Sequence, residues 1–591
     1  MPYLEFPDKI VIALYFAFVL AIGLYFRKRA SKNLESFILG GRKMPWFLAG
    51  ISMVATTFAA DTPLYVTEVV AKYGISGNWA WFHFLIGGLL TTFLFARLWK
   101  RSGVLTEAEF INIRYSGKEA KILRIFKSVY LGFIINIVIM SWVNLALVKI
   151  FVVVFGVDKW DATLITGAVM LLVLFYSAVS GLLGVVYTDF VQFIIAFGGC
   201  VVLAILVLQS DKVGGVSGLK EALPEGSLDL LPNFGDSIST SWHLPILSFF
   251  AYTGIMWWSS WYPGAEPGGG GYIAQRMMST KSEKDAYKAT LLFQILNYCI
   301  RPWPWIIVGL SCVVLYPDLA ETDKGLGFVM AMKDYLPVGL KGLLLVAFLG
   351  AYMSTISTQL NWGVGMLVND AVMPLSKKEI SDKKQVYYGR IITVVLAIAS
   401  MILVNFIEEI KTVWDFVMQC GAGLGFVLIA RWLWWRINAW TEIVATITPF
   451  VVYGLNNIIL VDYFPSLGLP VFENPSGFML SVAVTIVASL VTIFFTKPTA
   501  NEKLVSFAEK VKPMGAWNGL VEGENRNNEL VISIAMWIFA VIMSYALLFV
   551  IADVLFQNWE VILPKALILL VSFAAFAWLS KLYNQKYLNK E

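Results

Sequence analysis

Charged side chains are scarce in this sequence. Asp, Glu, Lys and Arg make up 14% of its 591 residues, whereas 58% of the residues are hydrophobic and the mean hydropathy is +0.72. Soluble globular proteins carry about 25% charged residues, so this chain has too few charges to face water on all sides. The low charge content therefore excludes an ordinary soluble domain and indicates a surface that faces lipid.

Cysteine and histidine are also rare. There are two histidines, and the four cysteines (Cys200, Cys299, Cys312 and Cys420) all lie within apolar runs. Their spacing fits neither a disulfide framework nor a metal site, so we interpret them as small buried hydrophobes. The net charge of +5 belongs to the connections between apolar runs and gives no indication of nucleic acid.

Long apolar runs recur from residue 10 to residue 584. A helix needs about 20 apolar residues to cross a hydrocarbon core of about 30 Å, and closed barrels show short alternating segments instead. The sequence therefore predicts an all-α, polytopic membrane protein. We predict fifteen spans, at 10–26, 46–70, 79–98, 125–155, 161–180, 184–208, 243–275, 286–315, 338–372, 387–407, 413–434, 443–462, 478–496, 531–556 and 564–583.

Basic residues alternate between successive connections. The connections 27–45 and 99–127 carry six and seven Lys or Arg residues, whereas 209–242 carries five acids and two lysines. Basic connections stay in the cytoplasm. We therefore expect a multi-pass protein of the plasma membrane, the inner membrane in a bacterium, with its N-terminus outside and its C-terminus in the cytoplasm.

Two predicted spans contain residues that interrupt a helix. The second span holds Asp61 and Pro63 after a run of small and hydroxyl residues, and the seventh holds four consecutive glycines at 268–271. Freed backbone groups have no water to bond within lipid, so such residues need a partner there. If spans two to six and seven to eleven form inverted repeats, the interruptions are equivalent, which is typical of a transporter's binding site. The alternative is a simple kink in each, or a loop at 262–271.

Four motifs form a set. They are SFILGGR at 36–42 followed by Pro45 and Trp46, LTEAEF at 105–110 followed by Arg114 and Tyr115, YSAVSG at 176–181 with VYTDFVQ at 186–192, and AYMSTIST at 351–358 followed by Leu360 and Asn361. Together they resemble the sodium:solute symporter family, to which the sodium/glucose cotransporters belong. The resemblance covers about residues 20 to 440. It implies a LeuT-like 5+5 inverted-repeat core, with one extra helix before it and four after it.

The resemblance also implies a division of the chain and an activity. The extra N-terminal helix and a cytoplasmic loop occupy 1–45, the first repeat 46–208, an extracellular loop 209–242, the second repeat 243–436, and the C-terminal helices with a cytoplasmic loop at 497–530 occupy 437–591. The implied activity is sodium-coupled symport of a small polar organic solute by alternating access, with Na+ as the coupling ion.

The family's pattern places sodium ligands on this chain. The main site comprises the backbone carbonyls of Ala55, Phe58 and Ala351 with the hydroxyls of Ser354 and Thr355. A second, deeper site comprises Asp189 with Ser354, Ser357 and Thr358. Hard cations prefer oxygen ligands, and the three hydroxyls at positions i, i+3 and i+4 share one helix face. The alternatives are hydroxyls used in helix–helix packing or in hydrogen bonds back to their own helix, and a structural role for Asp189, paired with a basic residue.

The solute pocket departs from the sugar-transporting members of the family. Their polar sugar-binding positions correspond here to Thr62, Trp81 and Asn297, so recognition of a hexose in their manner is not expected. The candidate substrate-binding residues are Asp61, Thr62, Glu68, Trp81, His83, Trp261, Glu266 and Gln419, with Trp257 and Trp258 as further aromatics. For Arg301 and Arg431 we expect structural ion pairs, and for His83 a satisfied place in the core.

Other classes fit less well. A membrane enzyme would need paired acids with a metal, or a nucleotide loop, and the glycine run lacks the lysine of a phosphate loop. We therefore expect no catalytic residues, and as partners a small-molecule solute and the lipid bilayer, without nucleic acid or an obligatory protein partner. The alternatives are a proton-coupled or uncoupled carrier and a transporter-like membrane sensor; the hydroxyls at 354–358 favour sodium over protons.

Overall fold

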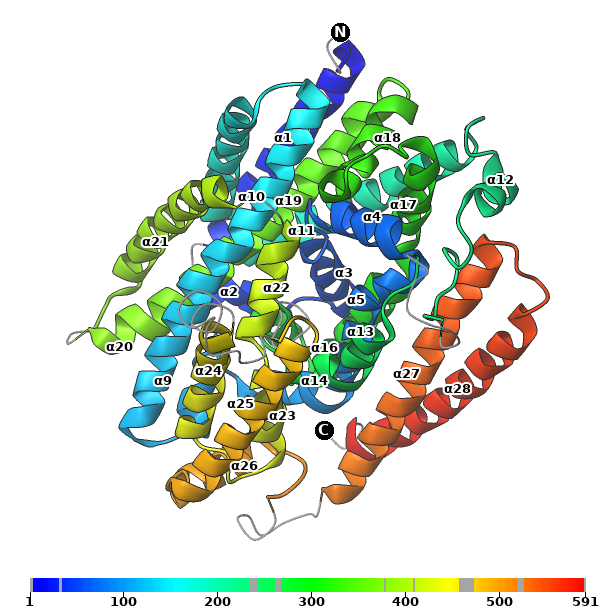
Figure 1. Cartoon of the computed structure of the whole chain (residues 1–591). Coiled ribbons are helices and arrows are strands. Elements are labelled where there is room, and N and C mark those ends of the chain that lie inside the picture. The colour runs from blue at the N-terminus through cyan, green and yellow to red at the C-terminus, as the bar shows by residue number, and fades with distance from the viewer. Residues whose placement is uncertain are drawn as a thin grey trace, which may run out of the picture.

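The computed structural model describes residues 4–30, 34–233, 242–260, 267–376, 379–407, 410–456, 472–517 and 526–588. Within these ranges the regular elements are helices, and pairing between extended residues is limited to two isolated bridges (Figure 1). The prediction of an all-helical protein is confirmed.

The helices fall into three groups along the chain. Up to residue 208 they are α1 (Phe6–Ala30), α2 (Leu34–Leu39), α3 (Trp46–Thr56), α4 (Thr62–Tyr73), α5 (Trp79–Phe82), α6 (Phe84–Leu90), α7 (Ala96–Ser102), α8 (Phe110–Arg114), α9 (Gly117–Val129), α10 (Asn136–Phe155) and α11 (Lys159–Leu208). From residue 215 to 433 they are α12 (Gly215–Ala222), α13 (Ile246–Ala251), α14 (Trp257–Ser259), α15 (Gly271–Ser279), α16 (Glu283–Gln294), α17 (Trp303–Leu315), α18 (Gly327–Tyr335), α19 (Leu340–Met366), α20 (Met373–Leu375), α21 (Asp382–Leu403), α22 (Ile410–Cys420) and α23 (Leu424–Leu433). The last are α24 (Ala439–Gly454), α25 (Ser476–Phe495), α26 (Asn501–Val511), α27 (Asn527–Leu555) and α28 (Ile562–Tyr583).

Short π-helical turns interrupt several spans. η3 (Thr91–Phe95) joins α6 to α7, η4 (Tyr130–Ile135) joins α9 to α10, η6 (Ile295–Ile300) follows α16, and η8 (Leu367–Val372) joins α19 to α20. Such turns are rare and frequent at functional sites. One of them, η6, carries two residues of the central cavity described below.

The predicted count of fifteen spans is not supported. In the described ranges ten helical stretches are long and apolar enough to cross a membrane, and eleven if the bent pair Val413–Cys420 and Leu424–Leu433 is one span. The predicted span 46–70 is split into α3 and α4, and 243–275 is divided into short pieces. The span 161–180 is the first part of α11, whose backbone Gly181 interrupts (φ +55°). For 443–462, α24 supplies 16 residues, and 457–462 lie outside the described residues.

The arrangement of the helices keeps the interrupted ones in the interior. α27 and α28 pack side by side at one edge, α1 packs on α11 and α19, and α3 and α4 lie in the middle of the bundle (Figure 1). α3 is covered by α11 and α16, and α4 packs on α17. The break between α3 and α4 therefore lies within protein, the only place where irregular backbone is tolerated at membrane depth.

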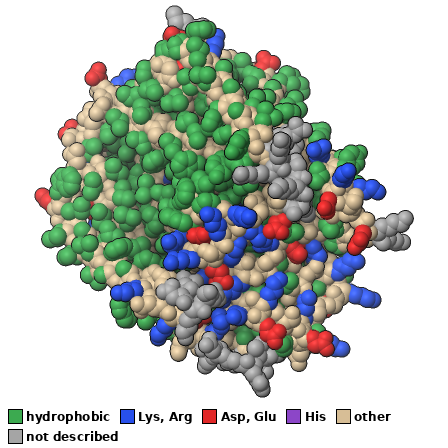
Figure 2. Space-filling model, turned by 180° about the vertical axis from the view of Figure 1, so that it is seen from behind, with side chains coloured by type: hydrophobic (Ala, Val, Ile, Leu, Met, Phe, Trp, Pro, Cys, Tyr) green, Lys and Arg blue, Asp and Glu red, His purple; other side chains and the backbone are tan. Residues whose placement is uncertain are grey.

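The outer surface is apolar over a wide area. Figure 2 shows hydrophobic side chains covering much of one face, with Lys and Arg gathered towards one end. Large apolar side chains that are mostly exposed include Leu171, Phe175, Ile398, Leu570 and Val571. A protein surrounded by water rarely exposes a continuous apolar surface of this kind. The surface fits a multi-pass membrane protein.

Candidate functional site

The first interruption lies between α3 and α4. α3 ends at Thr56, α4 begins at Thr62, and Pro63 lies in the first turn of α4, where its missing N–H leaves no bond unmade. Asp61 holds the N-cap position of α4, but its side chain makes no cap hydrogen bond. Its Oδ1 atom is buried and has no hydrogen-bond partner among the described residues. The break expected at Asp61 and Pro63 is present, and it leaves one carboxylate oxygen available.

A buried arginine holds the end of α3. Nη1 of Arg301 donates to the carbonyl of Val54 at 2.5 Å, and Nη2 donates to the carbonyl of Thr57 at 3.2 Å. The rings of Phe58 and Trp305 lie 5.5 and 5.1 Å from the guanidinium. The C-terminal end of a helix carries partial negative charge, which favours a cation there. In place of the ion pair expected for Arg301, the guanidinium binds backbone carbonyls.

A small central cavity of about 40 Å³ lies beside this break. Its lining residues come from the end of α3, the break, α4, α5, α10, α15, η6, α19 and α22. They are Thr56, Thr57, Ala59, Asp61, Thr62, Trp81, Ile139, Trp142, Val143, Tyr272, Asn297, Tyr298, Thr355, Gln359 and Trp414. Among these lining residues Asp61 is the single Asp, Glu, Lys or Arg, and five are aromatic. The predicted pocket residues Asp61, Thr62 and Trp81 are thus brought together.

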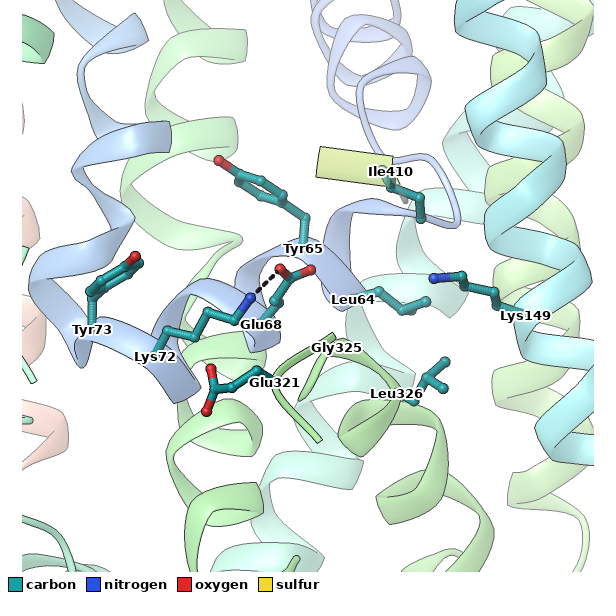
Figure 3. Close-up of a pocket in the computed structure, with 10 residues that line it drawn as sticks. All are labelled: Leu64, Tyr65, Glu68, Lys72, Tyr73, Lys149, Glu321, Gly325, Leu326 and Ile410. Carbon is teal, nitrogen blue, oxygen red and sulfur yellow. Dashed lines mark hydrogen bonds and ion pairs between the residues drawn. The ribbon is translucent and has the colours of Figure 1, made fainter. Parts of the chain in front are cut away.

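Stacked rings separate the central cavity from larger pockets. The rings of Tyr65 and Trp414 stack with 4.5 Å between their centroids and 22° between their planes. The ring centroid of Trp81 lies 6.1 Å from that of Trp414. Tyr65 also lines two outer pockets of about 250 and 280 Å³. Figure 3 shows the first of them, in which Glu68 and Lys72 form an ion pair of 2.8 Å. The pair Tyr65–Trp414 therefore lies between the outer pockets and the cavity.

Asp189 on α11 lies at the centre of a buried polar network. Its two carboxylate oxygens accept hydrogen bonds of 2.5 Å from the hydroxyls of Ser52 and Ser354. Nε of Arg276 donates to the Ser52 hydroxyl at 3.3 Å, and Nη2 donates to Thr358 at 2.8 Å. One hydroxyl thus connects a buried carboxylate to a buried guanidinium.

The residues of the predicted main sodium site are all buried where α3 meets α19. The Thr355 hydroxyl donates to the carbonyl of Thr56 at 3.0 Å, and the Ser354 hydroxyl donates to Asp189. A hydroxyl has one proton and two lone pairs, so both oxygens keep lone pairs for a cation. The donor chemistry at Ala55, Phe58, Ala351, Ser354 and Thr355 therefore fits sodium.

The predicted second sodium site is only partly assembled. Asp189 and Ser354 are in contact, but the Ser357 hydroxyl donates to the backbone carbonyl of Ser354 at 3.1 Å. Thr358 accepts a hydrogen bond from Arg276. Ser357 thus follows the back-bonding alternative, and a guanidinium occupies the position next to Thr358 where a second cation was expected.

The other predicted pocket residues lie elsewhere. Glu68 lines the first outer pocket, and Gln419 lines the second, where it donates to Asn474 at 2.6 Å. His83 is buried and stacks on Tyr252, and its Nδ1 bonds the carbonyl of Trp79 at 2.8 Å. Its Nε2 has no hydrogen-bond partner among the described residues, so this core histidine is satisfied at one ring nitrogen and not at both. Trp261 and Glu266 lie outside the described residues.

The remaining predicted side chains have structural partners. Trp257 lies 5.5 Å from Trp537, and the indole of Trp258 donates to the carbonyl of Gly254. Arg431 forms the expected ion pair, with Glu442 at 3.0 Å, an acid that sequence reasoning had not connected to it.

The glycine run is held by protein groups. The carbonyl of Gly268 accepts a hydrogen bond of 2.9 Å from the Trp99 indole, and the amide of Gly271 donates to Glu107 at 2.6 Å. A Cβ at Gly268 would lie 2.6 Å from the carbonyl oxygen of Leu428, and its φ is +81°. Only glycine fits there. The sequence predicts that this run needs a partner, and the partners found are side chains.

Several residues of the candidate site are absent from the sequence-based prediction. Arg276 has no place among the predicted site residues, although it lies buried in α15. Ser52 and Thr56, its hydrogen-bond acceptors, are four residues apart on α3, and this spacing could have indicated a common face. The aromatic residues Trp142 and Tyr298 carry no local signal that separates them from packing aromatics.

Comparisons with known proteins agree with this geometry. A model of the sodium:solute symporter family matches residues 37–447. The chain is 23% identical over 525 residues to the sodium/glucose cotransporter of Vibrio parahaemolyticus, covering 83% of this chain and 90% of that protein. It is 26% identical over 502 residues to the osmoregulated proline transporter OpuE of Bacillus subtilis, covering 82% of this chain and 94% of that protein.

A solved structure has the same fold. It is described as the substrate-bound outward-open state of a Na+-coupled sialic acid symporter with a novel Na+ site, and it superposes with a TM-score of 0.66 at 19% identity. The match covers 84% of this chain and 99% of that chain. Because the family match covers most of the sequence, the resemblance seen in the motifs is confirmed: the chain belongs to the sodium:solute symporter family.

Proposed function

We propose that this protein carries a small polar organic solute across the membrane together with sodium, by alternating access. The observation that carries the proposal is the pair of hydroxyls on Ser354 and Thr355, buried beside the end of α3 with their protons directed to other acceptors. Their lone pairs, together with the carbonyls of Ala55, Phe58 and Ala351, form an oxygen set suited to a small hard cation. Family membership supports the same ion.

Sodium at this position links the two halves of the proposed core. The ligands on α3 belong to 46–208, and those on α19 belong to 243–436, the ranges that we assign to the two inverted repeats. Sodium binding draws α3 and α19 together, beside the central cavity that Thr355 also lines. Ion binding and solute binding therefore act on the same contact between repeats, which is the physical basis for coupling them.

The second sodium position belongs to the proposal in a restricted form. Asp189 and Ser354 supply oxygens, but the guanidinium of Arg276 already balances the carboxylate through Ser52. A second sodium at Asp189 requires Arg276 to move away. We therefore propose that the second ion binds only in a conformation in which α15 has shifted relative to α3.

Access to the cavity is controlled by the stacked pair Tyr65–Trp414. The two outer pockets on its far side lie next to α4, α13 and the segment before α18. With the N-terminus outside and the C-terminus in the cytoplasm, these pockets face the extracellular side. Separation of the two rings then opens the cavity to that side, and contact between them closes it.

Sodium binding to the purified protein tests the main site. In sodium chloride, compared with potassium chloride of equal concentration, the native protein is expected to unfold at a higher temperature. A ligand at 100 times its Kd stabilises by about 2.7 kcal/mol. The double substitution Ser354→Ala and Thr355→Ala removes two ligands and is expected to abolish the difference between the salts.

A matched control separates ligand loss from general damage. Ser311 is buried in α17, and its hydroxyl donates to the carbonyl of Ile307 at 2.8 Å. Ser311→Ala removes a hydroxyl of the same kind away from the proposed site and should keep the sodium response. A folded double variant whose unfolding temperature still rises in sodium as in the native protein would refute the assignment of the main site.

A further inference from the structure

The protein engages the carboxylate of Asp61 only in part, through the backbone at residues 61 and 62 and the side chain of Trp414. It is buried at the N-cap of α4 but does not cap the helix, and its Oδ1 has no hydrogen-bond partner among the described residues. A buried carboxylate oxygen that lacks a partner is costly, and acids at membrane depth mark substrate or ion pathways. Asp61 lines the central cavity, so its missing partner is expected to enter there.

The nearest buried cation does not fill this role. Arg301 acts electrostatically on Asp61, yet its two Nη groups donate to the backbone carbonyls of Val54 and Thr57. These carbonyls belong to the negative end of α3 and offset part of the charge of Arg301. Because the two Nη groups are directed to carbonyls, Asp61 remains the single Asp, Glu, Lys or Arg side chain among the residues that line the cavity.

Aromatic faces surround the carboxylate. Trp81, Trp142 and Trp414 line the cavity. The ring centroid of Trp414 lies 6.1 Å from that of Trp81 and 5.9 Å from that of Trp142. Tyr298 lies 5.7 Å from Trp81. Aromatic faces attract cations, and cages of such rings are the usual means of binding alkylated ammonium groups. A carboxylate within aromatic walls, with one oxygen that lacks a hydrogen-bond partner among the described residues, suits an ammonium group with apolar substituents.

Unpartnered polar atoms lie around the same cavity. Nδ2 of Asn297 and Nε1 of Trp81 are buried donors that lack an acceptor among the described residues. Oδ1 of Asn297 accepts a hydrogen bond of 2.9 Å from Thr57, which fixes the orientation of the amide. The cavity thus offers two donors to an oxygen acceptor on the same solute.

We propose that the central cavity selects a solute with a protonated or quaternary ammonium group, with Asp61 as its counter-charge. The rings of Trp81, Trp142 and Trp414 enclose the ammonium group, and Asn297 binds an oxygen of the solute. This inference rests on the proposed transport function. A hexose supplies hydroxyl donors but no positive charge, so it leaves the Asp61 charge uncompensated in the cage.

Binding to the purified protein distinguishes these solutes. The probes are glycine betaine, choline, L-proline and D-glucose, each measured by thermal unfolding and by microcalorimetry in sodium and in potassium chloride. We expect at least one of the three ammonium compounds to bind, and D-glucose not to bind. Binding of D-glucose without binding of any ammonium probe, or no binding by any of the three ammonium probes, would overturn the proposal.

Charge substitution tests the role of Asp61 directly. Asp61→Asn keeps the size of the side chain and should weaken ammonium binding at least about tenfold, because the attraction between the carboxylate and the ammonium charge is lost. Asp553→Asn is the matched control, since Asp553 is a buried acid of α27 that pairs with Lys565 at 2.7 Å, away from the cavity. Equal affinity in Asp61→Asn and the native protein contradicts the assignment.

Two further measurements distinguish a failure of the solute proposal from a failure to fold and from a failure of the transport proposal. If Asp61→Asn does not fold, Trp142→Leu tests the cage, and unchanged ammonium affinity in that variant counts against the proposal. The unfolding shift caused by sodium alone reports on the transport proposal. Its absence in a native protein that still binds an ammonium probe contradicts sodium coupling and leaves the solute assignment standing.

Discussion

The network of Asp189, Ser52 and Arg276 makes a quantitative prediction. The carboxylate and the guanidinium are both buried, and the Ser52 hydroxyl accepts from Nε of Arg276 while donating to Asp189. Neutralising one partner alone leaves the other charge without compensation. Neutralising both, with Asp189→Asn and Arg276→Gln, leaves two polar but uncharged side chains that still reach Ser52.

The magnitude follows from the geometry. Removing one partner of a directly bonded buried ion pair costs about 3–5 kcal/mol. Here one hydroxyl separates the two charges, so we expect a smaller coupling free energy of about 1–2 kcal/mol, within the range measured for residues of one network. Arg276→Gln also loses the hydrogen bond to Thr358, and this loss appears equally in the single and double variants and cancels in the cycle.

The coupling is measured as a double-mutant cycle. The free energy of unfolding of the native protein, the two single variants and the double variant is determined in potassium chloride, so that sodium at Asp189 does not contribute. We expect the double variant to be more stable than the sum of the single losses predicts. Additive losses, within about 0.5 kcal/mol, would show that the charges do not depend on each other.

Three further predictions concern ion stoichiometry, topology and the second break. The second sodium is proposed to bind at Asp189 only after Arg276 has moved away during transport. The sodium Hill coefficient of solute uptake should then exceed one in the native protein, and Asp189→Asn should lower this coefficient to one. A charge-to-solute ratio of one for a neutral or zwitterionic solute in native proteoliposomes means that a single sodium is carried. A reporter fused after residue 230 should be extracellular and one fused after residue 510 cytoplasmic, and finding both on one side rejects the proposed orientation. Gly268→Ala should destabilise the protein by more than about 1 kcal/mol, because its Cβ would lie 2.6 Å from the Leu428 carbonyl at a φ of +81°; Gly254→Ala, whose Cβ meets no atom within 4 Å, is the control in the same unfolding assay.

The interruptions in the helices could be predicted, whereas the number of spans could not. Pro63 and the glycines at 268–271 restrict the backbone locally, so their effect is visible in the sequence. Hydropathy measures how apolar a segment is and not whether its helix continues. For this reason 46–70 is predicted as one span although α3 ends at Thr56. The predicted spans 161–180 and 184–208, in contrast, are separated where Gly181 interrupts α11.

The residues of the candidate site could likewise be predicted only where the signal in the sequence is local. Asp61, Thr62 and Trp81 follow from their nearness to the break, and they line one cavity. The partners of Asp189 come from α3, α15 and α19, and only the tertiary fold brings these helices together. Glu68 lies one and a half turns beyond the break on α4, which places it in the outer pocket instead of the cavity.

Arg301, which binds the C-terminal end of α3, has a consequence for the step of the transport cycle in which the carrier returns empty. A symporter must return empty to the side where it loads, and at that stage neither ion nor solute is present to satisfy the interrupted backbone. Arg301, which donates to the carbonyls of Val54 and Thr57, is covalently part of the chain and does not leave when ion and solute are released. The empty carrier therefore returns with this end of its first interrupted helix already held in shape, and reloading requires less reordering of the backbone.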